Sequence, residues 1–303
     1  MRYLVEYLGR LKSVSITVES DAEITRLEAR DSMLYITTRE IYELPLGVST
    51  HPLISTPNST RVSLRLPASL DTAKHSWEFK VPFQANELKN RTIYCVKCGS
   101  QLSSLGEVRQ LPSEYWAELM EFWHCHKPHE AGPATNKGYN LAPVPGRALV
   151  GDTYLLLHPQ DLTACEHISP EKIWKWQFKV GNISLKSHIY IAAMLRELID
   201  SHAIFTFEIT GTKSQTSILV WVLNVMSEFI VNTGKLNSGL KIYFSANEAD
   251  FPTLKSTRGE VEAVSIPDEE LLNLISHLSE FNSLLPSEVR TYGDWKLAFL
   301  SDL

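Results

Sequence analysis

The feature that most constrains the fold is the Cys-x-x-Cys pair formed by Cys95 and Cys98, which is followed by Gly99. The pair comes directly after a strand-like segment, residues 92–94. A knuckle of this kind points two thiolates at one ion, so it supplies half of a tetrahedral zinc site. Two ordinary buried cysteines would also account for the pair, because free cysteine packs as a small apolar residue. A redox pair would open a helix after a parallel strand, and the residues after Gly99 do not resemble one.

A zinc site at this knuckle needs two further ligands. The chain has 4 cysteines, and in a reducing compartment they are expected to be metal ligands or buried thiols rather than disulfides. The sequence offers two sources for the missing ligands, and spacing alone leaves the choice open. The sources are Cys125 with His124, His126 or His129, and Cys165 with His167.

The first source follows a predicted amphipathic helix that begins near Ser113 and ends near His124. Its apolar residues fall at i, i+3, i+4 and i+7, namely Trp116, Leu119, Met120 and Trp123. Residues 127–146 are rich in Pro, Gly, Asn and Ala and are expected to form a long loop. The thiol and imidazoles beside that loop either close the zinc site or project toward a metal held by another protein. Solvated histidines beside a buried cysteine are the simpler interpretation.

The two ends of the chain have different patterns. The front part contains short alternating segments that predict an antiparallel β region, at residues 3–8, 14–19, 33–38, 61–66 and 77–81, with an exposed loop at 46–59. The last third predicts a helix ending near Ser201, a hairpin of 204–210 and 217–223, a strand at 240–244 and a helix opened by Pro267.

These patterns predict an α+β fold. The N-terminal half is β-rich and contains the zinc knuckle, and the C-terminal strands are antiparallel and pack with two or more helices. We expect three segments: a β-rich region at 1–90, a zinc-knuckle and Cys-His loop region at 91–182, and a C-terminal α+β region at 183–303. Within the middle segment, strand-like runs appear at 153–157 and 173–180.

Composition and charge exclude several classes of function. The formal net charge is -6 and no dense Lys/Arg block occurs, so no direct nucleic-acid binding is expected. No apolar run approaches the roughly 20 residues that cross a bilayer, and the start lacks the apolar stretch of a signal peptide. We therefore expect no membrane partner and a location in the nucleus and cytoplasm. Common hydrolase, nucleotide and dinucleotide signatures are absent.

Several short segments, taken in order, resemble the HECT-like ubiquitin-conjugating-enzyme-binding family. They are residues 94–99 (Tyr-Cys-Val-Lys-Cys-Gly), 111–116 (Leu-Pro-Ser-Glu-Tyr-Trp), 123–126 (Trp-His-Cys-His) and 150–153 (Val-Gly-Asp-Thr). Further matches are 205–207 (Phe-Thr-Phe), 220–224 (Val-Trp-Val-Leu-Asn), 283–286 (Ser-Leu-Leu-Pro) and 298–300 (Ala-Phe-Leu). The resemblance runs from about residue 94 to the end, and the first ninety residues match only in being β-rich.

The resemblance implies both a metal site and partners. Where other members carry a second Cys-x-x-Cys pair, this chain has Cys165-Glu166-His167, so the implied zinc ligands are Cys95, Cys98, Cys165 and His167. Members are described as ubiquitin ligases, and fungal members also as proteins important for pre-mRNA cleavage and polyadenylation. That second role involves a zinc-dependent endonuclease of the metallo-β-lactamase type. The resemblance then implies that the segment of Trp123, His124, Cys125 and His126 faces the active site of this nuclease.

Three functions are consistent with these observations. The first is an adaptor or chaperone that inserts its Cys-His loop at the endonuclease active site, with zinc as cofactor. The alternative is a HECT-like ubiquitin-protein ligase that binds a ubiquitin-conjugating enzyme. Covalent transfer needs a cysteine nucleophile, and because no cysteine follows Cys165, only Cys125 is available for it. The third is a zinc-stabilised binding module for a ubiquitin-conjugating enzyme, with no catalytic residue.

Overall fold

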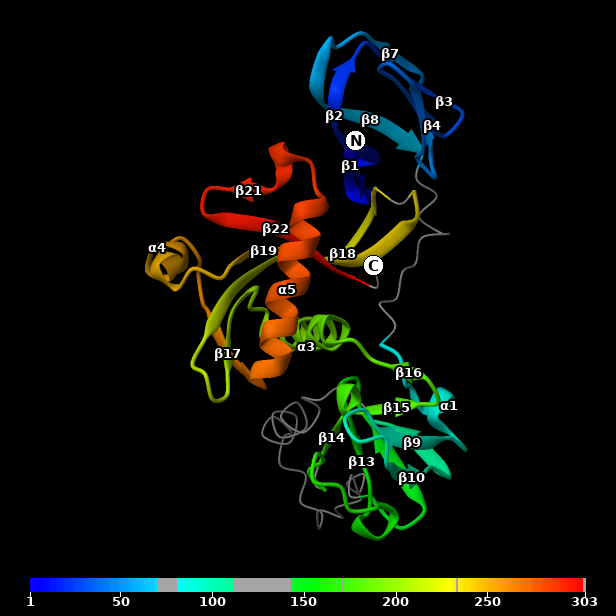
Figure 1. Ribbon diagram of the computed structural model, residues 1–303, viewed down its shortest axis with the longest axis vertical. Coiled ribbons are helices and arrows are strands. Elements are labelled where there is room, and N and C mark those ends of the chain that lie inside the picture. The colour runs from blue at the N-terminus through cyan, green and yellow to red at the C-terminus, as the bar shows by residue number, and fades with distance from the viewer. Residues whose placement is uncertain (70–80, 112–142, 171, 233, 302–303) are drawn as a thin grey trace, which may run out of the picture. The chain divides into compact units, whose positions relative to one another are not determined.

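The computed structural model describes residues 1–69, 81–111, 143–170, 172–232 and 234–301 (Figure 1). The residues form two compact units. Unit 1 contains residues 1–79 and 204–303, and unit 2 contains residues 80–203. The two ends of the chain share unit 1 because strand β1 (Arg2–Leu8) pairs with β18 (Ser217–Val231). The three segments expected from the sequence, 1–90, 91–182 and 183–303, stay a prediction.

Unit 1 is built on a ten-stranded sheet in the order β21-β22-β19-β18-β1-β2-β8-β6, with β17 pairing with β18 and β20. Its remaining strands are β2 (Ser13–Ile24), β6 (Ser49–Thr50), β8 (Ser59–Ser69), β17 (Thr206–Gly211), β19 (Leu236–Ser245), β20 (Glu262–Ile266), β21 (Thr291–Tyr292) and β22 (Trp295–Ser301). The predicted β17–β18 hairpin is confirmed. The expectation that all C-terminal strands are antiparallel is wrong at β20, which runs parallel to β17. A parallel pair needs a crossover, and the chain reaches β20 through helix α4 (Phe251–Ser256).

A second sheet of unit 1 has the order β5-β4-β3-β7. Its strands are β3 (Arg26–Arg30), β4 (Met33–Thr37), β5 (Ile41–Pro45) and β7 (Leu53–Ser55). Alternate apolar side chains of this sheet and of β1, β2 and β8 form one buried cluster, which includes Val5, Ile16, Leu27 and Ile36. The predicted loop at 46–59 is partly wrong, because β6 and β7 extend the two sheets there and Leu46 is buried.

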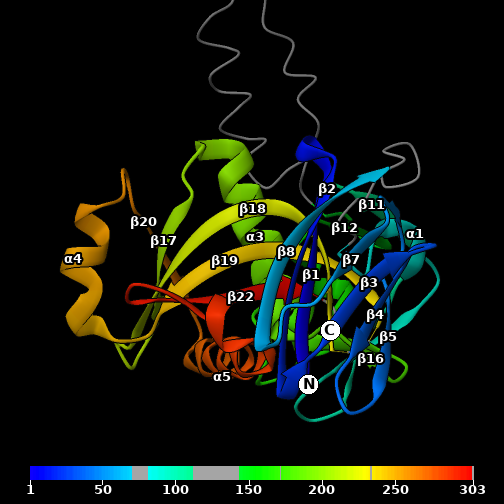
Figure 2. The same ribbon diagram turned by 90° about the horizontal axis from the view of Figure 1, so that it is seen from above.

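Helix α5 (Asp268–Leu284) lies against β22, as Figures 1 and 2 both show. It begins after Pro267 and carries three acidic residues in its first turn, as the sequence predicts. Its ring of Phe281 lies 5.8 Å from that of Phe229 and 5.6 Å from that of Phe299, between ring centroids. The aromatic contacts bury one face of the helix on the sheet.

Unit 2 contains two four-stranded sheets, β10-β9-β15-β16 and β11-β12-β13-β14. The strands are β9 (Thr92–Cys95), β10 (Gln101–Ser104), β11 (Glu107–Gln110), β12 (Arg147–Val150), β13 (Tyr154–Leu156), β14 (Ile173–Trp174), β15 (Phe178–Val180) and β16 (Ile183–Ser184). Helices α1 (Ala85–Leu88) and α3 (Ser187–His202) also belong to the unit. The continuous strand predicted at 173–180 is wrong, because a 3-10 turn at Lys175–Gln177 carries the chain from one sheet to the other.

Three predictions fall wholly or mostly outside the residues that the structure describes: the helix at 113–124, the loop at 127–146 and the strand at 77–81. The predicted helix near 191–201 is confirmed as α3. Within the described ranges, no helix combines the length and apolar character needed to cross a membrane.

Candidate metal centre

The first half of the site is the tight turn between β9 and β10. The backbone N–H of Gly99 donates to the carbonyl of Cys95 at 3.0 Å, and the N–H of Cys95 donates to the carbonyl of Ser100 at 2.8 Å. Gly99 has a φ of +72°, a left-handed conformation that glycine adopts without steric cost. The turn therefore folds Cys98 back over the end of β9, where Cys95 pairs with Phe178 of β15.

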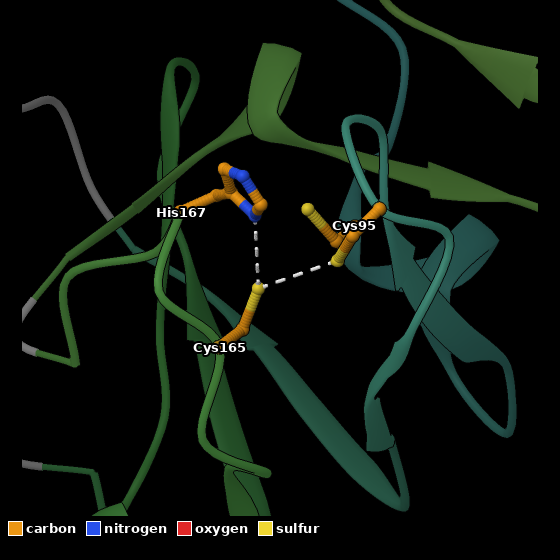
Figure 3. A group of neighbouring side chains, drawn as sticks. Cys95, Cys165 and His167 are labelled. Carbon is orange, nitrogen blue, oxygen red and sulfur yellow. Dashed lines mark hydrogen bonds between the residues drawn. The ribbon is translucent and has the colours of Figure 1, made fainter.

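The second half of the site is the loop that follows β13. The N–H of Thr163 donates to the carbonyl of Leu102 in β10 at 2.8 Å, so the loop is attached to the knuckle's own hairpin. A second bond, from the N–H of Ile168 to the carbonyl of Cys165 at 3.1 Å, closes a turn around His167. Ile168 is buried. These contacts direct the thiol of Cys165 and the imidazole of His167 toward Cys95 (Figure 3).

The four donor groups lie at distances that suit one metal ion. The Sγ atoms of Cys98 and Cys165 are 3.6 Å apart, and the Sγ of Cys165 is 3.7 Å from Nδ1 of His167. All four ligand atoms, including the Sγ of Cys95, lie within 4.8 Å of one another. Tetrahedral zinc with Zn–S bonds of about 2.3 Å separates two sulfurs by about 3.8 Å. The cysteines are free thiols, and the donor set fits zinc.

Burial and hydrogen bonding set the pKa values of the three thiols apart. Cys95 is fully buried, and loss of hydration raises its pKa. Cys98 is exposed, and hydrogen bonds from the hydroxyl and then the backbone of Ser100 lower its pKa to about 6. The backbone of His167 lowers the pKa of Cys165, while the Cys165 thiol raises the pKa of the His167 imidazole. Two of the three thiols therefore reach the thiolate form, which binds metal, more readily than free cysteine does.

The structure brings together one of the two ligand sets that the sequence allows. Cys165 and His167 lie beside Cys95 and Cys98. The alternative donors and the predicted partner-binding residues lie outside the described residues; they are Trp123, His124, Cys125, His126 and His129.

Sequence reasoning missed Ser100. Its Oγ lies 2.9 Å from the Sγ of Cys98 and 3.8 Å from that of Cys165. The signal that would have found it is its position directly after the Cys-x-x-Cys-Gly knuckle, where a hydroxyl can reach the thiolates.

A four-donor protein set leaves no position for water or substrate, so the chemistry it suits is structural. A metal bound there would join the knuckle of Cys95 and Cys98 to the loop of Cys165 and His167. Cys98 and Cys165 lie 67 positions apart in the sequence. Such a cross-link restricts the unfolded chain and holds two sheets of unit 2 together.

Comparison with known proteins places the chain in a family. The profile described as HECT-like ubiquitin-conjugating enzyme (E2)-binding matches residues 6–173 and 169–297. An uncharacterised protein of Saccharomyces cerevisiae is 22% identical over 99% of both chains. A protein of Mus musculus named as an E3 ubiquitin-protein ligase is 25% identical over 69% of this chain and 70% of its own, and its namesake in Rattus norvegicus is 26% identical over 84% and 83%. No solved structure matches. This chain therefore belongs to the HECT-like family of proteins that bind ubiquitin-conjugating enzymes.

Proposed function

We propose that this protein binds a ubiquitin-conjugating enzyme, and that a zinc ion at the Cys-His cluster keeps unit 2 in the conformation that binding requires. The observation that carries the proposal is the family match, which covers residues 6–173 and 169–297 and so includes strands of both units. Relatives that match 70–83% of their own length are named as E3 ubiquitin-protein ligases. A ligase of any mechanism has to engage a ubiquitin-conjugating enzyme, so binding is the step these proteins share.

The cluster suits a structural part in this function. Cys95 is buried at the end of β9, and Cys98 and Cys165 lie 3.6 Å apart. Zinc would take all three as thiolates together with the imidazole of His167. The side chains would then be ligands, and none of these thiolates would be available to attack a thioester.

Covalent ubiquitin transfer is therefore restricted to one cysteine. No cysteine follows Cys165 in the sequence, and the fourth cysteine, Cys125, lies outside the described residues. If the protein forms a ubiquitin thioester, Cys125 carries it. A protein that only binds and orients the charged conjugating enzyme needs no nucleophile of its own, and this simpler mechanism is the one we propose.

The test is direct binding. Purified protein is titrated against a panel of ubiquitin-conjugating enzymes, each with and without a ubiquitin thioester, by isothermal titration calorimetry. We expect at least one enzyme to bind the wild type and to bind the metal-free Cys95→Ser variant at least tenfold more weakly. Failure of every enzyme to bind would refute the proposal. A non-reducing gel of the same mixtures, with Cys125→Ser as the comparison, separates covalent transfer from binding alone.

A second candidate is the adaptor for the zinc-dependent endonuclease of pre-mRNA cleavage and polyadenylation, acting in the nucleus and cytoplasm. One observation favours it: Cys165 and His167 already complete the four-donor set, so Cys125 and His126 are left for another role. A thiol and an imidazole of that kind can reach a metal held by a partner. The test mixes the protein with the purified endonuclease and compares wild type with Cys125→Ala and His126→Ala. Equal binding and equal nuclease activity for all three would contradict this role.

A further inference from the structure

A row of aromatic side chains in mutual contact, ending in an arginine, crosses the end of the ten-stranded sheet in unit 1. It consists of Tyr292 on β21, Tyr243 on β19, Trp221 on β18 and Arg258, which follows α4. The ring centroids of Tyr292 and Tyr243 are 5.8 Å apart, and those of Tyr243 and Trp221 are 5.6 Å apart. The guanidinium carbon of Arg258 lies 3.5 Å from the centre of the Trp221 ring. We call these four residues the aromatic row.

The aromatic row rests on a packed base and is open to solvent at one end. Trp295, whose ring centroid is 6.0 Å from that of Trp221, is 2% exposed and packs with Leu219, Phe251 and Leu254. Tyr292 is 60% exposed. A rigid aromatic surface with a buried base costs little conformational entropy when a partner covers it, and Trp, Tyr and Arg are the residues most enriched at binding hot spots.

Arg258 differs from the other cations of unit 1 that lie over aromatic rings. Lys241, over Phe299, pairs with Glu6 at 2.5 Å, and Lys255, over Phe251, pairs with Glu208 at 2.7 Å. A third, Arg30 over Tyr35, also lies within 3.5 Å of a carboxylate.

No carboxylate or hydrogen-bond acceptor contacts the Arg258 side chain among the described residues, and its Nε is buried without a hydrogen-bond partner. The guanidinium is therefore oriented by stacking and has no ion-pair partner within the part of the chain that the structure describes. A planar guanidinium held in this way is suited to a bidentate bond with a carboxylate. An acidic side chain is the kind of partner that such a guanidinium suits.

We infer that the aromatic row is a docking site for the ubiquitin-conjugating enzyme, which places an aspartate or glutamate against Arg258 and apolar atoms against Trp221 and Tyr292. The inference rests on the proposed function and assigns one of its contacts to unit 1, in addition to the contact for which unit 2 has to be folded. The contact combines a charge pair, which sets orientation, with aromatic burial, which supplies most of the binding free energy.

The experiment measures the dissociation constant of the conjugating enzyme that binds the wild type, using calorimetry at low and high salt. Arg258→Met removes the charge and keeps an apolar cover over Trp221, and it is expected to weaken binding at least tenfold at low salt. At high salt the dissociation constants of Arg258→Met and wild type should differ less, because screening weakens the charge pair. Tyr292→Ala, which alters an exposed side chain outside the core, is expected to weaken binding roughly threefold to tenfold.

Matched controls separate docking from a structural effect. Arg39→Met removes an exposed arginine and Ile41→Ala truncates a 68% exposed apolar residue, both near β5 and away from the aromatic row; neither should change binding. If wild type binds and Arg258→Met and Tyr292→Ala bind equally well, the inference is overturned and the proposed function stands. If no conjugating enzyme binds the wild type, the inference and the proposed function are both refuted. Thermal unfolding of each variant shows whether a weaker affinity comes from a damaged fold.

Discussion

The two units of this protein reach their folds by different means. Unit 1 has long strands, such as β18 with 15 residues and β2 with 12, and buries large apolar clusters between its sheets and under α5. In unit 2, no described strand exceeds four residues, and the Cys-His cluster joins segments that short strands alone hold weakly. The difference leads us to propose that one chain combines a fold stabilised by apolar burial with one that a metal ion at the Cys-His cluster stabilises.

The largest expected effect comes from removing Cys95, one of the four proposed metal ligands. Cys95→Ser, or a strong chelator, should abolish zinc binding and unfold the β9-β10-β15 region, because a structural zinc ion supplies about 10 kcal/mol or more in small domains. Metal content by mass spectrometry and hydrogen exchange of individual amides measure this. Amides of β18 and β19 serve as the internal control and should keep their protection. Unchanged protection of β9 in the zinc-free variant would show that unit 2 does not depend on metal.

The second prediction concerns unit 1, where truncation of a buried aromatic side chain opens a cavity. Phe229 is fully buried, with its ring centroid 4.0 Å from that of Phe299. Phe229→Ala should lower the free energy of unfolding by about 3–5 kcal/mol, as measured by denaturant titration, while zinc content stays the same. Phe205→Ala, at a residue 45% exposed, is the control and should cost less than about 1 kcal/mol. Loss of zinc from Phe229→Ala would mean that the two units are energetically coupled.

A smaller, pH-dependent effect on stability is expected at Glu19, whose hydrogen bonds connect the N-terminal sheet to the C-terminal part of unit 1. Hydrogen bonds from the hydroxyl and the backbone N–H of Ser287, at 2.6 and 2.9 Å, lower its pKa from 4.5 to about 2. A lowered pKa stabilises the folded state above the unfolded value, and this stabilisation is lost as the pH falls from about 4.5 toward 2.

Glu19→Gln should therefore lower stability by about 2 kcal/mol at neutral pH, and the difference from wild type should shrink below pH 4.5. Chemical unfolding at several pH values measures this difference in the free energy of unfolding. The control is Glu23→Gln, at an exposed position on the same strand. A difference that is independent of pH would contradict the assignment to the Glu19 carboxylate.

The smallest effect is expected at Ser100, which hydrogen-bonds to thiols of the cluster without being a ligand. Ser100→Ala should weaken zinc affinity about tenfold, or about 1.4 kcal/mol, because groups that orient ligands tune metal binding. Competition with a chromophoric chelator measures the affinity. Ser104→Ala, on the same hairpin, is the comparison and should leave the affinity within about twofold. An equal loss in both variants would indicate a general disturbance of the hairpin.

Much of the fold could be predicted from local sequence patterns. The alternation in β1, β2, β4 and β8 and the 3.6-residue periodicity of α5 are short-range signals, and the structure confirms them. The strand predicted at 173–180 failed because apolar alternation does not reveal that the chain changes sheets at Lys175–Gln177.

The sequence by itself determined that Cys95 and Cys98 share a turn, because a Cys-x-x-Cys-Gly spacing leaves two thiols on one side of a tight bend. Only the tertiary structure decided that Cys165 and His167 lie beside them, since that choice depends on the attachment of Thr163 to β10. The aromatic row likewise gathers its four side chains from four separate segments of the chain. Short-range spacing records local geometry, whereas contacts between distant segments depend on strand register and packing of the whole chain.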